Sequence, residues 1–123
     1  MRKLLALTLI ISLNSCFFYK KDGIEVNIKN NSSETISKIE FTTSEKVKFL
    51  NFDSIEPNKS VREFLPMSKN ESDGAYLLTF ERADGKNETC GGGYYTNGSS
   101  LDHWVDFFVE NDTTIVKFDA PIY

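Results

Sequence analysis

Histidine, tryptophan and cysteine are scarce in this chain, and the shortages exclude several kinds of chemistry. The sequence of 123 residues has one histidine (His103), one tryptophan (Trp104) and two cysteines, Cys16 and Cys90. Zinc sites need clusters of cysteine and histidine, and the sequence holds no such cluster. A cysteine nucleophile needs a base beside its sulfur, and no neighbour of Cys90 in the sequence supplies one. We therefore expect no enzyme, no catalytic residue, no metal and no cofactor.

Long apolar runs and an excess of basic residues are also missing. The longest apolar stretch, residues 4–13, has about ten residues, whereas a helix that spans a bilayer needs roughly twenty. The 18 acidic residues outnumber the 14 basic ones, which gives a net charge of −4. Nucleic-acid phosphates require lysine and arginine. This balance argues against a nucleic-acid partner.

The sequence Cys90-Gly91-Gly92-Gly93 looks most like a functional motif. Glycines let the backbone approach a ligand or adopt positive φ, and the thiol is a potential nucleophile. However, the motif lacks the Lys-Ser/Thr ending and the following helix of a phosphate-binding loop. We favour a structural or bulged loop as its interpretation.

The N-terminal sequence has the pattern of a secretion signal that ends in a cysteine. Arg2 and Lys3 precede the apolar residues 4–13, and the signal closes with Leu13-Asn14-Ser15-Cys16. This pattern resembles the lipobox of bacterial lipoproteins. The resemblance implies that residues 1–15 are removed as a signal peptide and that Cys16 is lipidated on its sulfur and on its new amino terminus. An ordinary secretory signal is the alternative.

Processing at Cys16 would leave a small acidic protein close to a membrane. The 108 remaining residues lose Arg2 and Lys3, so 12 basic residues face 18 acidic ones, with a net charge of −6. Two or more acyl chains anchor a protein stably. Residues 16–22 form a short tether, in which the six residues after Cys16 reach at most about 20 Å, and residues 23–123 form one domain. Phe17, in the place of the aspartate that retains many lipoproteins at the inner membrane, favours the outer membrane.

Apolar residues alternate with polar ones along most of the domain, which is typical of half-buried strands. The alternation and the turns between apolar runs predict an all-β antiparallel β-sandwich. Immunoglobulin-like topology is favoured because it is common at this length, although the Cys…Trp…Cys spacing of true immunoglobulin domains is missing. We expect seven to eight short strands, at residues 24–28, 39–41, 47–52, 61–65, 75–82, 94–95, 101–109 and 113–118.

Two local features qualify this prediction. A change of phase at Leu50 and Phe52 indicates a bulge in the third strand, while Ser44 could instead cap a short helix over residues 44–52. The polar run Asn30-Asn31-Ser32-Ser33 has the composition of an exposed turn. The Asn97-Gly98 pair between two apolar runs predicts a hairpin.

The predicted strand 101–109 and the residues just before it carry the candidate binding patch. On a strand, Asp102, Trp104, Asp106 and Phe108 share one face, and Tyr94 and Tyr95 precede them across the hairpin. The patch comprises Tyr94, Tyr95, Asp102, Trp104 and Asp106. Aromatic rings flanked by carboxylates suit protein contacts or stacking on a sugar.

The same alternation leaves an alternative open, in which Trp104 and Phe108 pack into the core. It also places His103 on the other face of the strand, beside Leu101 and Val105, and predicts a half-buried histidine.

Together these patterns lead us to expect a lipid-anchored envelope protein that acts as a non-catalytic binding or structural module. Its contacts would be the membrane, through Cys16, and a protein or glycan partner. One alternative is an inhibitor or immunity-type lipoprotein against a basic hydrolase, which the net charge and the short tether favour. The other is a glycan-binding accessory lipoprotein, which Tyr94, Tyr95 and Trp104 favour.

Overall fold

The structure is a computed structural model, and it describes residues 22–119. These residues form nine strands: β1 (Gly23–Asn30), β2 (Ile36–Thr43), β3 (Phe49–Ile55), β4 (Ser60–Pro66), β5 (Gly74–Glu81), β6 (Asn87–Thr96), β7 (Ser99–Ser100), β8 (Trp104–Val109) and β9 (Thr114–Phe118). Within 22–119 there is no helix, so the alternative of a short helix over residues 44–52 does not hold. That range accordingly contains no helix that could cross a membrane.

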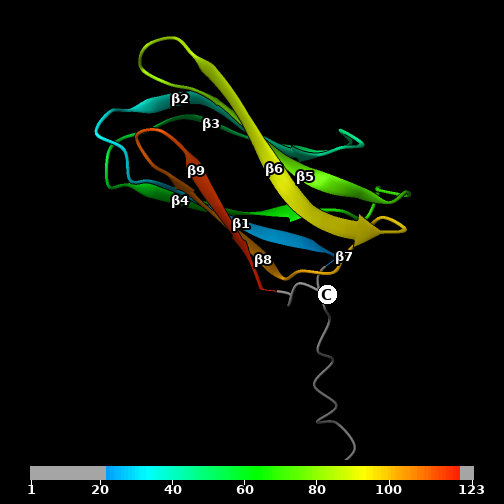
Figure 1. Cartoon of the computed structure of the whole chain (residues 1–123). Helices are drawn as coiled ribbons and strands as arrows, with labels where there is room; N and C mark the ends of the chain where they lie inside the picture. Colours follow the sequence, from blue (N-terminus) through cyan, green and yellow to red (C-terminus); the bar gives the residue numbers. More distant parts are fainter. Residues whose placement is uncertain (1–21, 120–123) are drawn as a thin grey trace, which may run out of the picture.

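The strands form two sheets that pack face to face (Figure 1). One sheet has the order β4-β1-β8-β9, and the other has the order β3-β2-β5-β6-β7. Neighbouring strands are antiparallel, except that β1 runs parallel to β8. The prediction of a β-sandwich is confirmed.

The first two strands are arranged differently from those of a constant-type immunoglobulin domain. In a constant-type immunoglobulin domain the first two strands are neighbours in one sheet, whereas here β1 and β2 belong to different sheets. The physical reason is the connection 31–35, which crosses the sandwich instead of forming a hairpin. The side-chain amide of Asn30 holds this connection in place by donating hydrogen bonds to the backbone carbonyls of Glu34 and Ile55, at 2.8 Å each.

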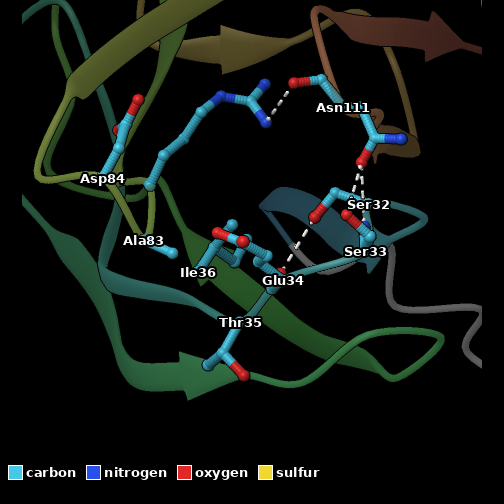
Figure 2. Close-up of a pocket in the computed structure, with 9 residues that line it drawn as sticks. Ser32, Ser33, Glu34, Thr35, Ile36, Ala83, Asp84 and Asn111 are labelled. Carbon is cyan, nitrogen blue, oxygen red and sulfur yellow. Dashed lines mark hydrogen bonds between the residues drawn. The ribbon is translucent and has the colours of Figure 1, made fainter.

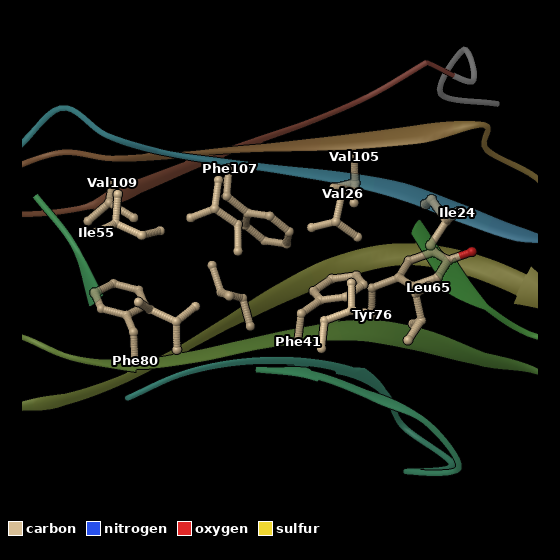
Figure 3. Packing of buried hydrophobic residues seen from close by; sticks show 14 of the residues in the cluster. Ile24, Val26, Phe41, Ile55, Leu65, Tyr76, Phe80, Val105, Phe107 and Val109 are labelled. Atoms are coloured by element: carbon tan, nitrogen blue, oxygen red, sulfur yellow. The ribbon is translucent and has the colours of Figure 1, made fainter. Parts of the chain in front are cut away.

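The core fills the space between the sheets (Figure 3). Val105, Phe107 and Val109 point inward from β8, and Phe41 and Tyr76 face them from the other sheet. The Phe41 ring stacks on Tyr76 at 6.1 Å between centroids and meets the edge of Phe107 at 5.7 Å. The expected two-residue alternation therefore produces one continuous apolar layer.

Some strand details differ from the expectation. The ninth strand is the two-residue β7, which the Asn97-Gly98 turn joins to β6. The pairing of β2 with β3 is regular, so the predicted bulge is not in β3. Instead the register shifts in the pairing of β2 with β5, where Lys38 has a φ of 50°.

The connections between the strands divide between the two ends of the sandwich. The connections 31–35, 56–59, 82–86 and 110–113 gather at one end, which we call the distal end (Figure 1). Backbone hydrogen bonds of Asn30 with Asn58 and Lys59 and a side-chain bond of Asn111 to Ser33 tie three of them together. Because β1 runs from Gly23 towards the distal end, Gly23 lies at the opposite end of the sandwich.

Candidate functional site: the Trp104 depression

The structure does not bring the five residues of the predicted patch together. Tyr94 and Tyr95 lie on β6 in the five-stranded sheet, whereas Trp104 and Asp106 lie on β8 in the other sheet. Asp102 is buried in the segment that links β7 to β8. The reason is that the chain crosses between the sheets after β7, so residues that are close in sequence separate in space.

Tyr95 is part of the structural framework because its side chain is fully buried. Its hydroxyl donates to Glu45 Oε2 at 2.7 Å. The same carboxylate accepts hydrogen bonds from the Asn70 side chain and from the backbone amides of Glu71 and Ser72, each at 3.0 Å. These bonds, that of Tyr95 above all, lower the pKa of Glu45 from 4.5 to about 2. The Glu45 carboxylate thus fastens the loop 67–73.

We expect Glu45→Gln to lower the melting temperature at neutral pH, because the amide cannot accept all four bonds. A carboxyl whose pKa is lower in the folded state stabilises the protein fully above its unfolded pKa, near 4.5, and loses this effect as the pH falls towards 2. Thermal unfolding is followed by circular dichroism from pH 7 to 2. The difference in melting temperature between the wild type and Glu45→Gln should become smaller as the pH falls. Glu40→Gln, at an exposed position on β2, is the control. A difference that stays constant with pH would contradict the assignment.

Tyr94 is half exposed and stands apart from Trp104. Its hydroxyl donates to Asp73 Oδ2 at 3.0 Å, and Asp73 Oδ1 accepts from the backbone amide of Asn97. This side chain therefore belongs to the contact between loop 67–73 and the β6–β7 hairpin.

The prediction for His103 is wrong, because its side chain is exposed instead of half-buried. Regular alternation begins only at Trp104, where β8 starts. Asp119 holds the segment in place: its Oδ2 lies 2.7 Å from His103 Nδ1, and its Oδ1 accepts from the His103 backbone amide at 2.7 Å.

Cys90 lies within β6 and not in a loop, and its side chain packs against the core. Burial, and to a smaller extent the charge of Glu88, raises the pKa of the thiol from 9.0 to about 11. A thiol that stays protonated at neutral pH is a poor nucleophile. The glycines serve a bulge in the β5–β6 pairing, because Gly93 has a φ of +71° and an added Cβ would lie 2.6 Å from the Phe118 ring.

Trp104 and Asp106 do belong to one site, on the outward face of the four-stranded sheet. The alternative in which Trp104 enters the core is excluded, since its side chain is 39 % exposed. A depression of about 230 Å³ is lined by Glu25, Arg62, His103, Trp104 and Asp106. We call this surface the Trp104 depression.

Three adjacent strands build the Trp104 depression. Glu25 on β1 lies beside Trp104 on β8 in the parallel register. Arg62 arrives from β4, and its Nε lies 3.2 Å from Glu25 Oε1. The sequence could indicate Trp104 and Asp106 through alternation on one strand, but Glu25 and Arg62 belong to strands whose pairing has no local signal.

A larger pocket, of about 360 Å³, opens at the distal end (Figure 2). Local sequence patterns do not indicate this pocket, because its walls come from three separate connections. They are Ser32, Ser33, Glu34, Thr35, Ile36, Arg82, Ala83, Asp84 and Asn111. Arg82 donates to Glu88 Oε2 at 2.6 Å and to the carbonyls of Glu110 and Asn111 at 2.8 and 3.2 Å. These bonds identify the Arg82 side chain chiefly as a structural tie between the connections.

Comparisons with known proteins bear on the fold alone. The sequence matches no protein-family model and no curated protein. Among solved structures, the NMR structure of a protein from Eubacterium rectale is similar, with a TM-score of 0.54 and 12 % sequence identity. The similarity covers 82 % of this chain and 92 % of that chain. At such low identity it supports the β-sandwich and carries no inference about activity.

Proposed function

We propose that this chain is a lipid-anchored protein of the bacterial envelope that acts as a non-catalytic binding module through the Trp104 depression. The observation that carries the proposal is the placement of Trp104, the only tryptophan of the chain, in a hollow on an open sheet face. Large aromatic side chains are usually well buried in a small domain. Tryptophan and arginine are also the residues that most often dominate binding energy at interfaces.

The anchoring part of the proposal rests on the signal that ends at Cys16, which lies outside the described residues. Its geometric consequence starts at Gly23, the first residue of β1. Glu25, which lines the depression, comes only two residues later. A tether over residues 16–22 would therefore hold the depression near the membrane and direct the distal end away from it. Phe17 after Cys16 favours the outer membrane.

Lipidation is tested by growing cells that express the protein with a clickable palmitate analogue. We expect the wild-type protein to be labelled and to sediment with membranes. Cys16→Ala should abolish labelling and release the protein, if it is processed, into the soluble envelope fraction. Cys90→Ala is the matched control and should remain labelled. Labelling that persists in Cys16→Ala would refute the anchor.

Binding is tested by placing a photo-crosslinking amino acid on either face of the sandwich in living cells. Position 27, which pairs with Asp106, lies on the face of the depression. Position 79, between the buried Leu78 and Phe80, lies on the opposite face. We expect one defined adduct from position 27 and none from position 79. Equal adducts from both faces, or none from either, would contradict a binding surface at the Trp104 depression.

A further inference from the structure

We propose that the Trp104 depression binds a neutral saccharide, with one sugar ring stacked on the Trp104 indole. This inference rests on the proposed function, because it names the ligand class of the same site.

The charges around the depression argue against an anionic ligand. Arg62 is its only cationic side chain when His103 is neutral, and Arg62 already pairs with Glu25 at 3.2 Å. Asp106 adds a second carboxylate. A phosphate or an anionic lipid headgroup would therefore meet two carboxylates and one arginine that already pairs with one of them, which is unfavourable in charge.

Two further ligand classes fit poorly. A metal ion is disfavoured, since residues 22–119 contain no group of three or more histidine, cysteine, aspartate or glutamate side chains that could hold one. A purely apolar ligand would find only Trp104 as a partner, because the other lining side chains are polar. The ligand must therefore combine an apolar surface with several neutral hydrogen-bonding groups.

A pyranose ring has this combination. The C–H groups on one side of the ring form an apolar surface, which can pack on the exposed indole face. Its hydroxyls both donate and accept, so they can donate to the carboxylates of Glu25 and Asp106 and accept from the guanidinium of Arg62. These side chains are planar, and each can bond two neighbouring hydroxyls at once.

Size and rigidity favour the same conclusion. Five residues line a hollow of about 230 Å³, whereas a stable protein interface uses about 20–30 residues on each side. Backbone contacts hold the site, since the Glu25 amide donates to the His103 carbonyl at 2.9 Å and Asp119 Oδ1 accepts from the Trp104 amide at 3.4 Å. A site on paired strands loses little conformational entropy when a ligand binds.

The single tryptophan makes the test specific, because the tryptophan emission of the protein reports on this site alone. The lipidated protein in phosphatidylcholine vesicles is titrated with neutral oligosaccharides of glucose, mannose, galactose and N-acetylglucosamine. We expect a saturable change in emission with at least one of them. Arg62→Ala keeps the fluorophore and should weaken binding about tenfold or more, as the loss of a charge-assisted hydrogen bond would. Lys38→Ala, which removes an exposed ion pair with Glu81 on the other sheet, is the control and should not change the affinity.

Trp104→Phe removes the fluorophore, so its affinity is measured by titration calorimetry and should fall, while Tyr94→Ala should leave it unchanged. If none of the sugars gave a saturable response, the proposal of a saccharide ligand would be overturned. If position 27 still gave a defined protein adduct, the binding surface would stand and its ligand would be a protein, such as a basic hydrolase. A shift of emission with phosphatidylglycerol vesicles, and with no sugar, would identify a lipid contact and also overturn the saccharide. Failure of both experiments would remove the proposed function as well.

Discussion

Asn30→Ala is expected to lower the free energy of unfolding by about 3 kcal/mol. The Asn30 side chain is fully buried. Its amide nitrogen donates to the carbonyls of Glu34 and Ile55, and its oxygen accepts from the backbone amide and the hydroxyl of Ser32. Alanine would leave several of these buried groups without partners, and each such group costs roughly 1–3 kcal/mol. Water that enters the site should recover part of the loss.

The measurement is urea unfolding followed by far-UV circular dichroism, with Asn31→Ala as the matched control. Asn31 is the next residue, but its side chain makes one hydrogen bond of 3.2 Å, to Glu110 at the partly exposed distal end. We expect its replacement to cost about 1 kcal/mol or less. Equal losses for the two variants would show that the crossing between the sheets does not depend on the Asn30 amide.

Phe107→Ala is expected to lower the free energy of unfolding by about 3–5 kcal/mol, the range for emptying a large aromatic site in a core. Phe107 has no exposed surface and contacts Phe41 of the opposite sheet edge to face. Its removal leaves a cavity between two sheets that strand pairing holds apart, so collapse around the cavity is limited. The total free energy of unfolding of a small domain is only about 5–15 kcal/mol, so the variant should be close to unfolding at room temperature.

Phe108→Ala is the control for this second prediction, because the two phenylalanines are neighbours on β8 and face opposite ways. Phe108 lies on the outward face, where Lys117 Nζ is 5.4 Å from the centre of its ring. Its loss should cost about 1 kcal/mol. Urea unfolding and differential scanning calorimetry of both variants measure the two losses of stability. A larger loss for Phe108→Ala would mean that the inward and outward faces of β8 are reversed.

The alternation on β8 shows which structural features the sequence pattern can predict and which it cannot. Period two groups Trp104 with Asp106 and Phe108 on one face and Val105 with Phe107 on the other, and the structure has these groups. The pattern alone does not say which aromatic face turns inward, because both faces carry large apolar side chains. Packing of Phe107 against Phe41 settles it. For that reason, the sequence alone also allows core packing of Trp104 and Phe108.

Other features depend on contacts between distant parts of the chain. Asn30 belongs to a polar run with the composition of an exposed turn, yet it is buried, because the following residues cross from one sheet to the other. The Trp104 depression needs β4, β1 and β8 side by side. Local propensity carries no information about a parallel pair formed by the first and the penultimate strands.

The parallel pair of β1 and β8 also has a consequence for the order of folding. In a chain that emerges N-terminus first, the hairpins β2–β3 and β5–β6 can form early, because their strands are close in sequence. The central strand β1 must wait for β8, since Glu25 pairs with Trp104 near the far end of the domain. Contacts at such long sequence separation slow folding. We expect the four-stranded sheet to stay open until nearly all of the chain is available.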